Sequence, residues 1–343
     1  MSQALTPRRS VALVVAAALG LLAGCSSTPP APPSGTTPAA GPAGAASASG
    51  ATAAAGAATA VTTGGGDVFP VTVGPPEARV TIRTRPAAVI SLSATATEDL
   101  FAVGAGPQVI AVDDQSNFPP GAPVTSLSAL KPSVEAIAGR RPDLVVISDD
   151  SSGLSASLAK VGITTLVAPA AKTLEDAYAQ IVEIGQATGH AAAGSAVVAT
   201  MRAAIAAVVG ATARPNPPLR IYHELDQTLY SATSSTFIGQ LYVLLGAVDV
   251  ADAADSAAAG GYPQLSQEYV VKADPDVIFL ADGGCCGQSE ATVAARPGWS
   301  TMSAVRHHAV VVLNDDVASR WGPRVVQLVK AIAAGLDAAG SGG

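Results

Sequence analysis

The chain has 343 residues, of which 49% are hydrophobic and 13% charged, and its formal net charge is −7. This length is sufficient for two α/β lobes that each bury a core of their own. The acidic balance and the lack of a basic cluster argue against nucleic acid as a partner.

The first 24 residues predict a targeting segment rather than a part of the fold. Arg8 and Arg9 precede the apolar stretch 11–22, which is too short to span a bilayer comfortably. The Leu-Ala-Gly-Cys sequence that ends at Cys25 resembles a bacterial lipobox, which implies that Cys25 is lipidated and becomes the first residue of the mature protein. The alternative is an ordinary secretory signal peptide followed by an unrelated cysteine.

Residues 25–66 predict a tether between a membrane and the globular part. After Cys25 this stretch consists almost entirely of Ala, Gly, Pro, Ser and Thr, and it carries no charge. Such a composition cannot bury enough apolar surface to offset the entropy lost on folding. No later segment is predicted to be long and apolar enough to span a membrane. We therefore expect an extracytoplasmic protein held to the cell membrane by its N-terminal lipid.

From residue 67 onward, apolar strands alternate with amphipathic helices, which predicts an α/β fold. Thr95 and Glu98 fit a capping box at the start of the first helix. Strands are expected at 87–92, 109–112, 144–147, 164–167, 219–222, 277–280 and 309–313, and the main helices at 95–103, 154–161, 174–187, 190–211, 237–245 and 324–338.

The helix expected at 190–211 is the longest of these segments. At ~1.5 Å per residue it would extend for about 30 Å, which is enough to connect two lobes. The expected division is an N-terminal lobe at 67–173, linking helices at 174–212 and a C-terminal lobe at 213–343.

One short pattern occurs twice in the chain. It reads SVEAIAGRRPDLVVI from Ser133 and SQEYVVKADPDVIFL from Ser266. Each copy has a serine suited to cap a helix, a glutamate two residues later, and a Pro-Asp pair that leads into a buried strand. Glu135 and Glu268 fall in the first helical turn, where the helix dipole favours negative charge. The repetition predicts two related lobes, and the alternative is two independent helix–strand units with ordinary caps.

Cys285 and Cys286 are adjacent in the sequence GGCCGQ. In an oxidising compartment two spare thiols tend to pair. Adjacent Cα atoms lie ~3.8 Å apart, less than the ~4.4–6.8 Å usual for a disulfide, so the flanking glycines would have to absorb strain. We expect a vicinal disulfide in a rigid loop at the rim of a ligand site, and the alternative is two free or externally capped thiols.

The order of several segments resembles the binding-protein component of ABC importers for cobalamin and iron–siderophores. The segments are SLSATATEDLFAVGAG, NFPPGAP, SVEAIAGRRPDLVVI, a long helix, YPQLSQEYVVKADPDVIFL and SRWGPR. The resemblance runs from about residue 79 to the C-terminus and implies two Rossmann-like lobes, a single long backbone helix joining them, and a ligand cleft between the lobes. It also implies a monomer without enzymatic activity or cofactor. Glu135 and Glu268 would dock it on Arg clusters of a permease dimer driven by a cytoplasmic ATPase.

The ligand is expected against the loops that follow the strands, where α/β folds usually bind ligands. Arg320 is the one cationic side chain in these loops, which carry several acids, so a neutral or cationic ligand is favoured. Together with the resemblance, this favours cobalamin or a related corrinoid, and a ferric siderophore is the alternative. The expected ligand-binding residues are Ser93, Thr95, Phe118, Tyr230, Tyr262, Arg320 and Trp321.

Other classes of function have weaker support in the sequence. A bare metal ion would need three or four converging His and carboxylate ligands, but none of the four histidines falls in the predicted loops of the first lobe, so no metal site is expected. The chain has no HExxH or GxSxG motif, which argues against an enzyme. A surface adhesin or co-receptor would be distinguished by the lack of saturable small-molecule binding.

Overall fold

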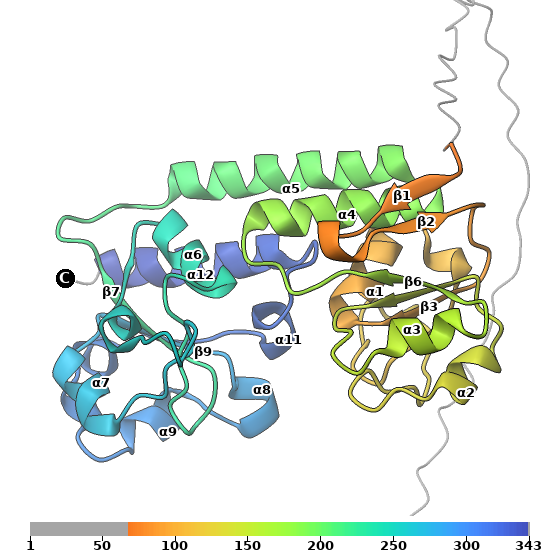
Figure 1. Ribbon diagram of the computed structural model, residues 1–343. Coiled ribbons are helices and arrows are strands. Elements are labelled where there is room, and N and C mark those ends of the chain that lie inside the picture. The colour runs from red at the N-terminus through yellow and green to blue at the C-terminus, as the bar shows by residue number, and fades with distance from the viewer. Residues whose placement is uncertain (1–67, 342–343) are drawn as a thin grey trace, which may run out of the picture. The chain divides into compact units, whose positions relative to one another are not determined.

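The computed structural model describes residues 68–341, which contain two parallel four-stranded sheets with helices around them (Figure 1). The predicted α/β class is therefore confirmed. The predicted signal segment 1–24, the lipidation of Cys25 and the tether 25–66 lie outside the described residues.

The N-terminal lobe is built on a sheet with the strand order β4-β3-β5-β6, in which all neighbours are parallel. An antiparallel hairpin that the sequence did not predict precedes it, and there β1 contacts α4 while β2 contacts β6. The strands are β1 (Val71–Val73), β2 (Val80–Ile82), β3 (Val89–Leu92), β4 (Val109–Val112), β5 (Leu144–Ile147) and β6 (Thr164–Val167). The helices are η1 (Pro76–Ala78), α1 (Ala94–Ala102), η2 (Gly106–Gln108), α2 (Val134–Ala138) and α3 (Leu154–Ala159).

The C-terminal lobe is built on a second parallel sheet, with the strand order β10-β9-β7-β8. Its strands are β7 (Arg220–Glu224), β8 (Val248–Asp249), β9 (Val277–Leu280) and β10 (Val310–Val312). Its helices are α6 (Phe237–Leu244), η3 (Val250–Ala254), α7 (Gln267–Ala273), α8 (Gly283–Cys286), α9 (Glu290–Ala294), η4 (Trp299–Thr301), α10 (Ser303–Arg306), α11 (Asp315–Ala318) and α12 (Val325–Ser341).

The two sheets share one topology. If the four strands of each sheet are numbered in chain order, both sheets have the spatial order 2-1-3-4. The repeated sequence pattern leads into the third strand in both lobes. Asp143 accepts hydrogen bonds from the backbone N–H groups of Ala87 and Ala88 just before β3, at 2.8 and 3.0 Å, and Asp276 accepts one from Arg220 at 2.8 Å. The Asp of each Pro-Asp pair thus ties the third strand to the first, and the prediction of two related lobes is confirmed in the topology.

The helix caps agree with the sequence in the repeated units but differ at the first helix. Ser133 accepts a hydrogen bond from the Ala136 N–H at 3.2 Å, and Ser266 accepts one from Tyr269 at 3.1 Å. The capping box predicted at Thr95 is wrong, because β3 ends at Leu92 and α1 begins directly after it. Ser93 has extended backbone there and caps the helix by accepting from the Ala96 N–H at 3.3 Å. Glu98 is therefore free of capping and available for other contacts.

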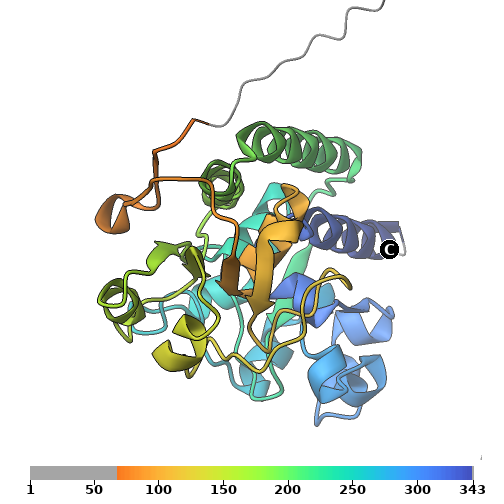
Figure 2. The same ribbon diagram turned by 90° about the vertical axis from the view of Figure 1, so that its right-hand side faces the viewer.

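Two helices follow the N-terminal lobe, α4 (Leu174–Thr188) and α5 (Ala191–Ala211). A capping box of Thr173 and Asp176 starts α4. Helix α5 packs along α4 and also contacts α12, and both views show it lying beside α12 (Figures 1 and 2). This is the long helix that the sequence predicted.

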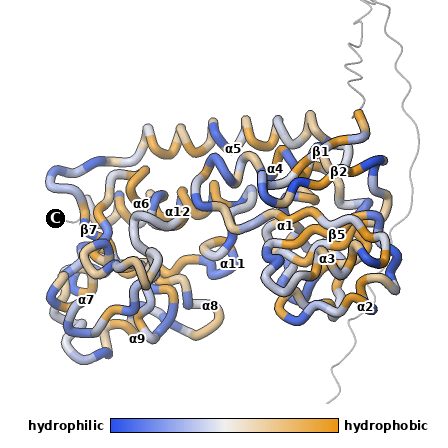
Figure 3. Tube along the Cα trace, in the orientation of Figure 1, coloured by the Kyte–Doolittle hydropathy of each residue, from blue (hydrophilic) through white to orange (hydrophobic). Residues whose placement is uncertain are grey.

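By length and composition, α5 is also the one helix within residues 68–341 that could cross a membrane, with a mean hydropathy of 1.7 over its most apolar window. The expectation that no segment after the N-terminal one passes this test was wrong. Alanines and valines give the helix its hydropathy, as its largely orange tube in Figure 3 shows. In the fold, Val198, Met201 and Ile205 of α5 are buried and belong to the largest core cluster.

The inner strands are covered on both faces. All residues of β3, β5 and β9 are buried, as expected for parallel sheets with helices on both sides. Figure 3 shows this apolar interior in orange at β5. The loops that follow these strands are thereby held on rigid supports.

Candidate functional site

The loops that follow the strands of one sheet contact those of the other sheet. Asn117, which follows β4, donates a hydrogen bond to Asp316 of α11 at 2.8 Å. Arg320, which follows α11, donates to the backbone oxygen of Gln115 at 3.0 Å and to the side chain of Asn117 at 2.9 Å. The carboxyl edges of the two sheets therefore meet at a common boundary, where open α/β folds place their ligands.

The centre of this boundary is an ionic cluster with a buried core of Glu98 and Arg320, which we call the interlobe cluster: Glu98, Asn117, Asp316, Arg320 and Arg324. Glu98 is only 3% exposed and accepts from Arg320 at 2.9 Å and from Arg324 Nε at 2.8 Å. Arg320 also donates to Asp316 at 2.8 Å. The two cations thus share the buried carboxylate of Glu98 from the N-terminal lobe, while the half-exposed Asp316 of the C-terminal lobe pairs with Arg320.

Four of the seven residues expected to bind ligand lie in or under this boundary. Ser93 and Thr95 are buried, and Ser93 caps α1. Arg320 is only 8% exposed, and its two terminal nitrogens already donate four hydrogen bonds. The Trp321 indole N–H donates to Gln180 of α4 at 2.9 Å. Arg320 and Trp321 therefore connect elements far apart in the chain, Ser93 stabilises the start of α1, and Arg320 has no free terminal nitrogen to offer an anionic ligand.

The other three expected residues are exposed aromatics, Phe118, Tyr230 and Tyr262, at 36%, 41% and 44% exposure. Arg324 lies over the Phe118 ring at 4.2 Å. Tyr230 and Tyr262 lie on two adjacent antiparallel segments, joined by hydrogen bonds from the Ser231 N–H to Pro263 and from the Thr233 N–H to Gly261. The two tyrosine rings are brought onto one ribbon of the C-terminal lobe, where they can offer apolar area and hydroxyl groups to a large ligand.

Each lobe also has a hollow at the carboxyl edge of its sheet. The one in the N-terminal lobe has a volume of about 290 Å³. The one in the C-terminal lobe has about 610 Å³, within the ~300–1,000 Å³ common for ligand sites. Its lining consists of Gly283, Gly284, Cys285, Val312, Leu313, Asn314, Asp315 and Asp316.

The wall of the C-terminal hollow contains the adjacent cysteines. Cys285 and Cys286 are joined in a disulfide, with Cα atoms 3.8 Å apart. They lie in the short helix α8 rather than in the irregular loop that the sequence suggested. Asp315 accepts hydrogen bonds from the backbone N–H groups of Gly284 at 3.0 Å and Cys285 at 2.6 Å. The disulfide segment is therefore attached to α11, whose next residue, Asp316, belongs to the interlobe cluster.

Behind the hollow lies a second group of buried charges that the sequence did not reveal. Arg296 donates two parallel hydrogen bonds of 2.6 Å to the carboxylate of Glu224, which is fully buried. Asp282 is also fully buried, and neither of its oxygens has a hydrogen-bond partner in the described part of the chain. Burial and then the nearby charge of Glu224 raise the pKa of Asp282 to about 6.

We expect Asp282→Asn to change how stability depends on pH. Because the pKa of Asp282 in the folded state lies above its ordinary value of 3.8, folding stability falls as the pH rises from about 4 through 6. The substitution removes a penalty of roughly 3 kcal/mol, so the variant should be more stable than the wild type at pH 8 and similar to it at pH 4. The measurement is the free energy of unfolding in urea at both pH values.

The control for this experiment is Glu77→Gln, which changes an exposed carboxylate in η1. It should leave the pH profile unaltered. Equal pH profiles for wild type and Asp282→Asn would show that the buried carboxylate is stabilised by contacts other than those seen here.

The histidines differ widely in their surroundings. Within residues 68–341, no three His, Cys, Asp or Glu side chains are grouped so that they could hold a metal ion. His223 is fully buried, its Nδ1 lies 2.7 Å from the Tyr242 hydroxyl, and burial lowers its pKa to about 4. His308 lies before β10 rather than inside a strand and is 2.6 Å from Glu290.

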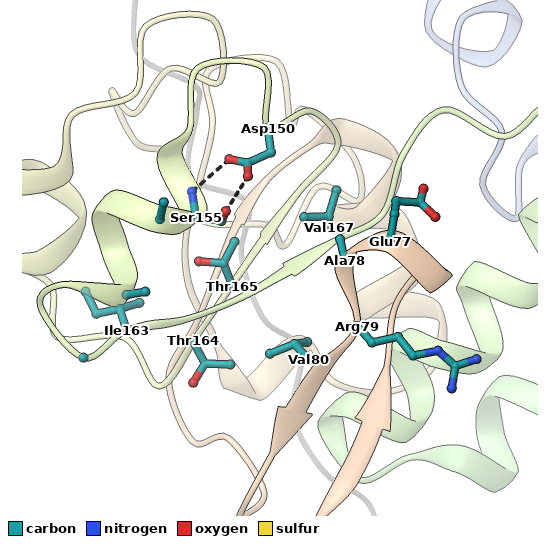
Figure 4. Close-up of a pocket in the computed structure, with 13 residues that line it drawn as sticks. Glu77, Ala78, Arg79, Val80, Asp150, Ser155, Ile163, Thr164, Thr165 and Val167 are labelled. Atoms are coloured by element: carbon teal, nitrogen blue, oxygen red, sulfur yellow. Dashed lines mark hydrogen bonds between the residues drawn. The ribbon is translucent and has the colours of Figure 1, made fainter.

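Another hollow, of about 620 Å³, lies wholly within the N-terminal lobe, between η1, β2, α3 and β6 (Figure 4). Asp150 stands at its upper end in the figure and accepts hydrogen bonds from the backbone N–H of Ser155, at 2.8 Å, and from its hydroxyl. It contains none of the expected ligand residues and does not touch the interlobe cluster.

The two glutamates of the repeated units lie on the surface, one in each lobe. Glu135 and Glu268 are exposed in the first turns of α2 and α7. Hydrogen bonds from its own backbone N–H and then from the Ser133 hydroxyl lower the pKa of Glu135. This carboxylate is therefore charged under physiological conditions and open to a cationic partner.

Two α/β lobes whose strand-end loops meet at a shared boundary, with a long helix beside them, define a class of solute-binding proteins. The family model for the periplasmic binding protein matches residues 89–317, and the chain belongs to this family. The family supplies the solute-binding components that work with the permeases and ATPases of ABC transporters.

Individual relatives agree with this assignment. The chain is 31% identical over 276 residues to a protein of Halobacterium salinarum named cobalamin-binding protein, covering 76% of this chain and 72% of that one. It is 29% identical over 277 residues to the uncharacterized ABC transporter substrate-binding lipoprotein YvrC of Bacillus subtilis, covering 78% and 85%.

Solved structures share the fold. The vitamin B12 binding protein BtuF of Vibrio cholerae matches with a TM-score of 0.59 at 24% identity, covering 74% of this chain and 98% of that one. The heme binding protein HutB of Vibrio cholerae matches with a TM-score of 0.64 at 21% identity, covering 72% and 97%. The predicted two-lobed fold of this family is thereby confirmed.

Proposed function

We propose that this protein is an extracytoplasmic lipoprotein that captures cobalamin or a related corrinoid and delivers it to the permease of an ABC importer. In this proposal the lobes at 67–173 and 213–343, joined by helices at 174–212, hold the ligand between them. Cys25 carries the lipid anchor, and Glu135 and Glu268 dock a monomer on the permease dimer. The protein itself catalyses no reaction and needs no cofactor.

The observation that carries the choice of ligand is the neutralisation of Arg320. It is the only Lys or Arg in the strand-end loops expected to line the cleft, and Glu98 and Asp316 already pair with it. The same loops contain several further carboxylates, including Asp149 and Asp315. Such a boundary disfavours an anionic ferric siderophore, since the charges of Arg320 and Arg324 are already balanced by the carboxylates of Glu98 and Asp316.

The polar groups of the C-terminal hollow suit a corrinoid. Asn314, Asp315 and Asp316 line it together with the apolar side chains of Val312 and Leu313. The amide side chains around the large ring of a corrinoid can donate N–H hydrogen bonds to carboxylate and carbonyl oxygens of the protein. The ring itself needs apolar contact. Tyr230 and Tyr262 are the exposed aromatics of this lobe that can stack on such a ring. The cobalamin-binding relative from Halobacterium salinarum supports the same choice.

The test is a calorimetric titration of residues 67–343 with cyanocobalamin. This part of the chain falls within one compact unit. We expect one-to-one binding at submicromolar affinity, about −8 kcal/mol or stronger. The double variant Tyr230→Ala/Tyr262→Ala should bind roughly tenfold more weakly or worse, because each lost aromatic contact costs about 1 kcal/mol. Val243→Ala, which shortens an exposed side chain on α6, is the matched control and should bind as the wild type does.

If titration with a ferric hydroxamate or with hemin released heat and titration with cyanocobalamin did not, the proposed ligand would change from cobalamin to that compound. A lack of saturable binding to any of the three would favour a surface co-receptor. A bare metal ion as ligand would be recognised by binding that a chelator reverses.

A further inference from the structure

The wall of the C-terminal hollow is held by a bond that can be broken reversibly. We propose that the Cys285–Cys286 disulfide sets the shape of this hollow, and that its reduction by a dithiol loosens the segment 283–288 and weakens ligand binding. This inference rests on the proposed function, since it concerns the regulation of the same site. It makes the chain a binding protein whose affinity depends on the thiol–disulfide balance outside the cell.

The disulfide is placed where a reductant and a ligand can both reach it. Cys285 and Cys286 are exposed, and Cys285 lines the hollow of about 610 Å³. Val312, the last residue of β10, and Leu313 after it form another part of the lining. A change in the position of α8 therefore changes the shape of the hollow directly.

The hydrogen bonds of the segment converge on a few acceptors. The N–H groups of Cys286 and Gln288 both donate to the backbone oxygen of Asp282, at 3.2 and 3.4 Å, and that of Gly287 donates to Gly283 at 3.0 Å. Asp315 accepts from the two remaining N–H groups, those of Gly284 and Cys285. All five depend on the tight turn of α8, so they would be lost or lengthened together if this turn opened.

Close packing leaves the closed segment little freedom to shift. A Cβ atom on Gly283 would collide with Val312, and one on Gly284 would come within 3.1 Å of Asp315. Gly287 has a φ of 70°, in the left-handed region, where it ends the short helix. The glycines thus permit this compact conformation. Once the disulfide is reduced, the same glycines give the backbone of the segment a wide range of accessible conformations.

The covalent bond supplies the constraint that these residues lack. A helix of a single turn is marginal by itself, because nucleation costs more than one turn of hydrogen bonds returns. The disulfide closes a ring through two successive residues and removes the rotamer freedom of both side chains. A dithiol breaks this S–S bond by exchange, becomes a cyclic disulfide itself, and leaves two protonated thiols, so that two electrons and two protons pass to Cys285 and Cys286.

The effect reaches the boundary between the lobes through α11. Asp315 holds the disulfide segment, while Asp316 accepts hydrogen bonds from Arg320 and from Asn117 of the N-terminal lobe. If the hydrogen bonds to Asp315 are lost, α11 is held less firmly next to Asp316, which belongs to the interlobe cluster. Reduction is therefore expected to alter the ligand contacts of the C-terminal lobe first, and the contact between the lobes second.

The experiment uses the full chain in detergent with Cys25→Ser, so that Cys285 and Cys286 are its only cysteines. Backbone hydrogen exchange is measured before and after reduction by dithiothreitol, which is then removed anaerobically. Exchange of the amides at 284–288 should rise about tenfold on reduction, while the N-terminal-lobe loop 149–153 should not change. The same two samples are titrated with cyanocobalamin, and the reduced protein should bind about tenfold more weakly.

The double variant Cys285→Ser/Cys286→Ser is the matched control. It should resemble the reduced protein in both measurements and should not respond to dithiothreitol. Unchanged exchange at 284–288 on reduction would overturn the inference whatever the ligand. Equal affinity of the oxidised protein, the reduced protein and the serine variant would overturn it too, while leaving the proposed function intact. No binding by the oxidised protein would instead contradict cobalamin as the ligand, and the exchange data would still decide the role of the disulfide.

Discussion

Replacing both Glu135 and Glu268 by alanine is expected to abolish ligand uptake while leaving ligand affinity unchanged. Both carboxylates are exposed at the starts of α2 and α7, one in each lobe, and neither lies at the interlobe boundary. A carboxylate in this position can pair bidentately with an arginine of a permease. Two such contacts on one rigid body add avidity, so the double variant should lose far more uptake than the two single variants suggest.

The measurement compares uptake of labelled cobalamin in cells that express the permease and ATPase with calorimetry on the same purified variants. Glu77→Ala/Glu175→Ala removes two other exposed carboxylates and is the matched control, with uptake expected to be normal. If the affinity of the Glu135/Glu268 variant fell as far as its uptake, these residues would act on the ligand rather than on the permease.

The repeated pattern shows why so much of the fold could be predicted. Each copy combines a capping serine, a helix of one or two turns, a Pro-Asp pair and a continuous apolar strand, and all of these are local signals. The structure also shows contacts between residues far apart in sequence, which local signals cannot predict. Asp143 and Asp276 do more than turn the chain. Asp143 holds Ala87 just before β3, and Asp276 holds Arg220 at the start of β7, each from 56 residues away in sequence. The hairpin of β1 and β2 was missed because its strands of three residues are too short to show a periodicity.

Sequence patterns predicted which loops follow the strands, but not the contacts that their side chains make. Arg320 was expected in a loop that lines a ligand cleft, and the structure shows it paired with Glu98, 222 residues earlier, a contact that no local sequence signal predicts. Glu98 fits a capping box at Thr95, and only the true start of α1 at Ala94 makes it available to the arginines. Asp282 follows its strand as many loop aspartates do, and nothing in the sequence distinguishes a buried carboxylate without a partner from an exposed one. Burial of charge is a property of the assembled lobes, so it appears only in three dimensions.

Glu98→Ala is expected to lower the free energy of unfolding by about 3–5 kcal/mol. The substitution leaves the buried guanidinium of Arg320 and the partly buried one of Arg324 without the carboxylate that both of them share. Removing one partner of a buried ion pair costs this much because the remaining charge stays desolvated. Burial raises the pKa of the neighbouring Asp99 well above its ordinary value, so ionising Asp99 in place of Glu98 would itself cost free energy. The measurement is urea denaturation followed by circular dichroism.

The matched control is Glu175→Ala, which breaks an ion pair with Arg202 in which both side chains are at least half exposed. Exposed pairs contribute about 0–1 kcal/mol, so this variant should be nearly as stable as the wild type. Because the interlobe cluster joins the two lobes, Glu98→Ala should also separate their unfolding, with a broader transition and a smaller denaturant dependence. Equal losses in the two variants, or a single sharp transition for both, would mean that packing of α5 and α12 rather than the interlobe cluster holds the lobes together.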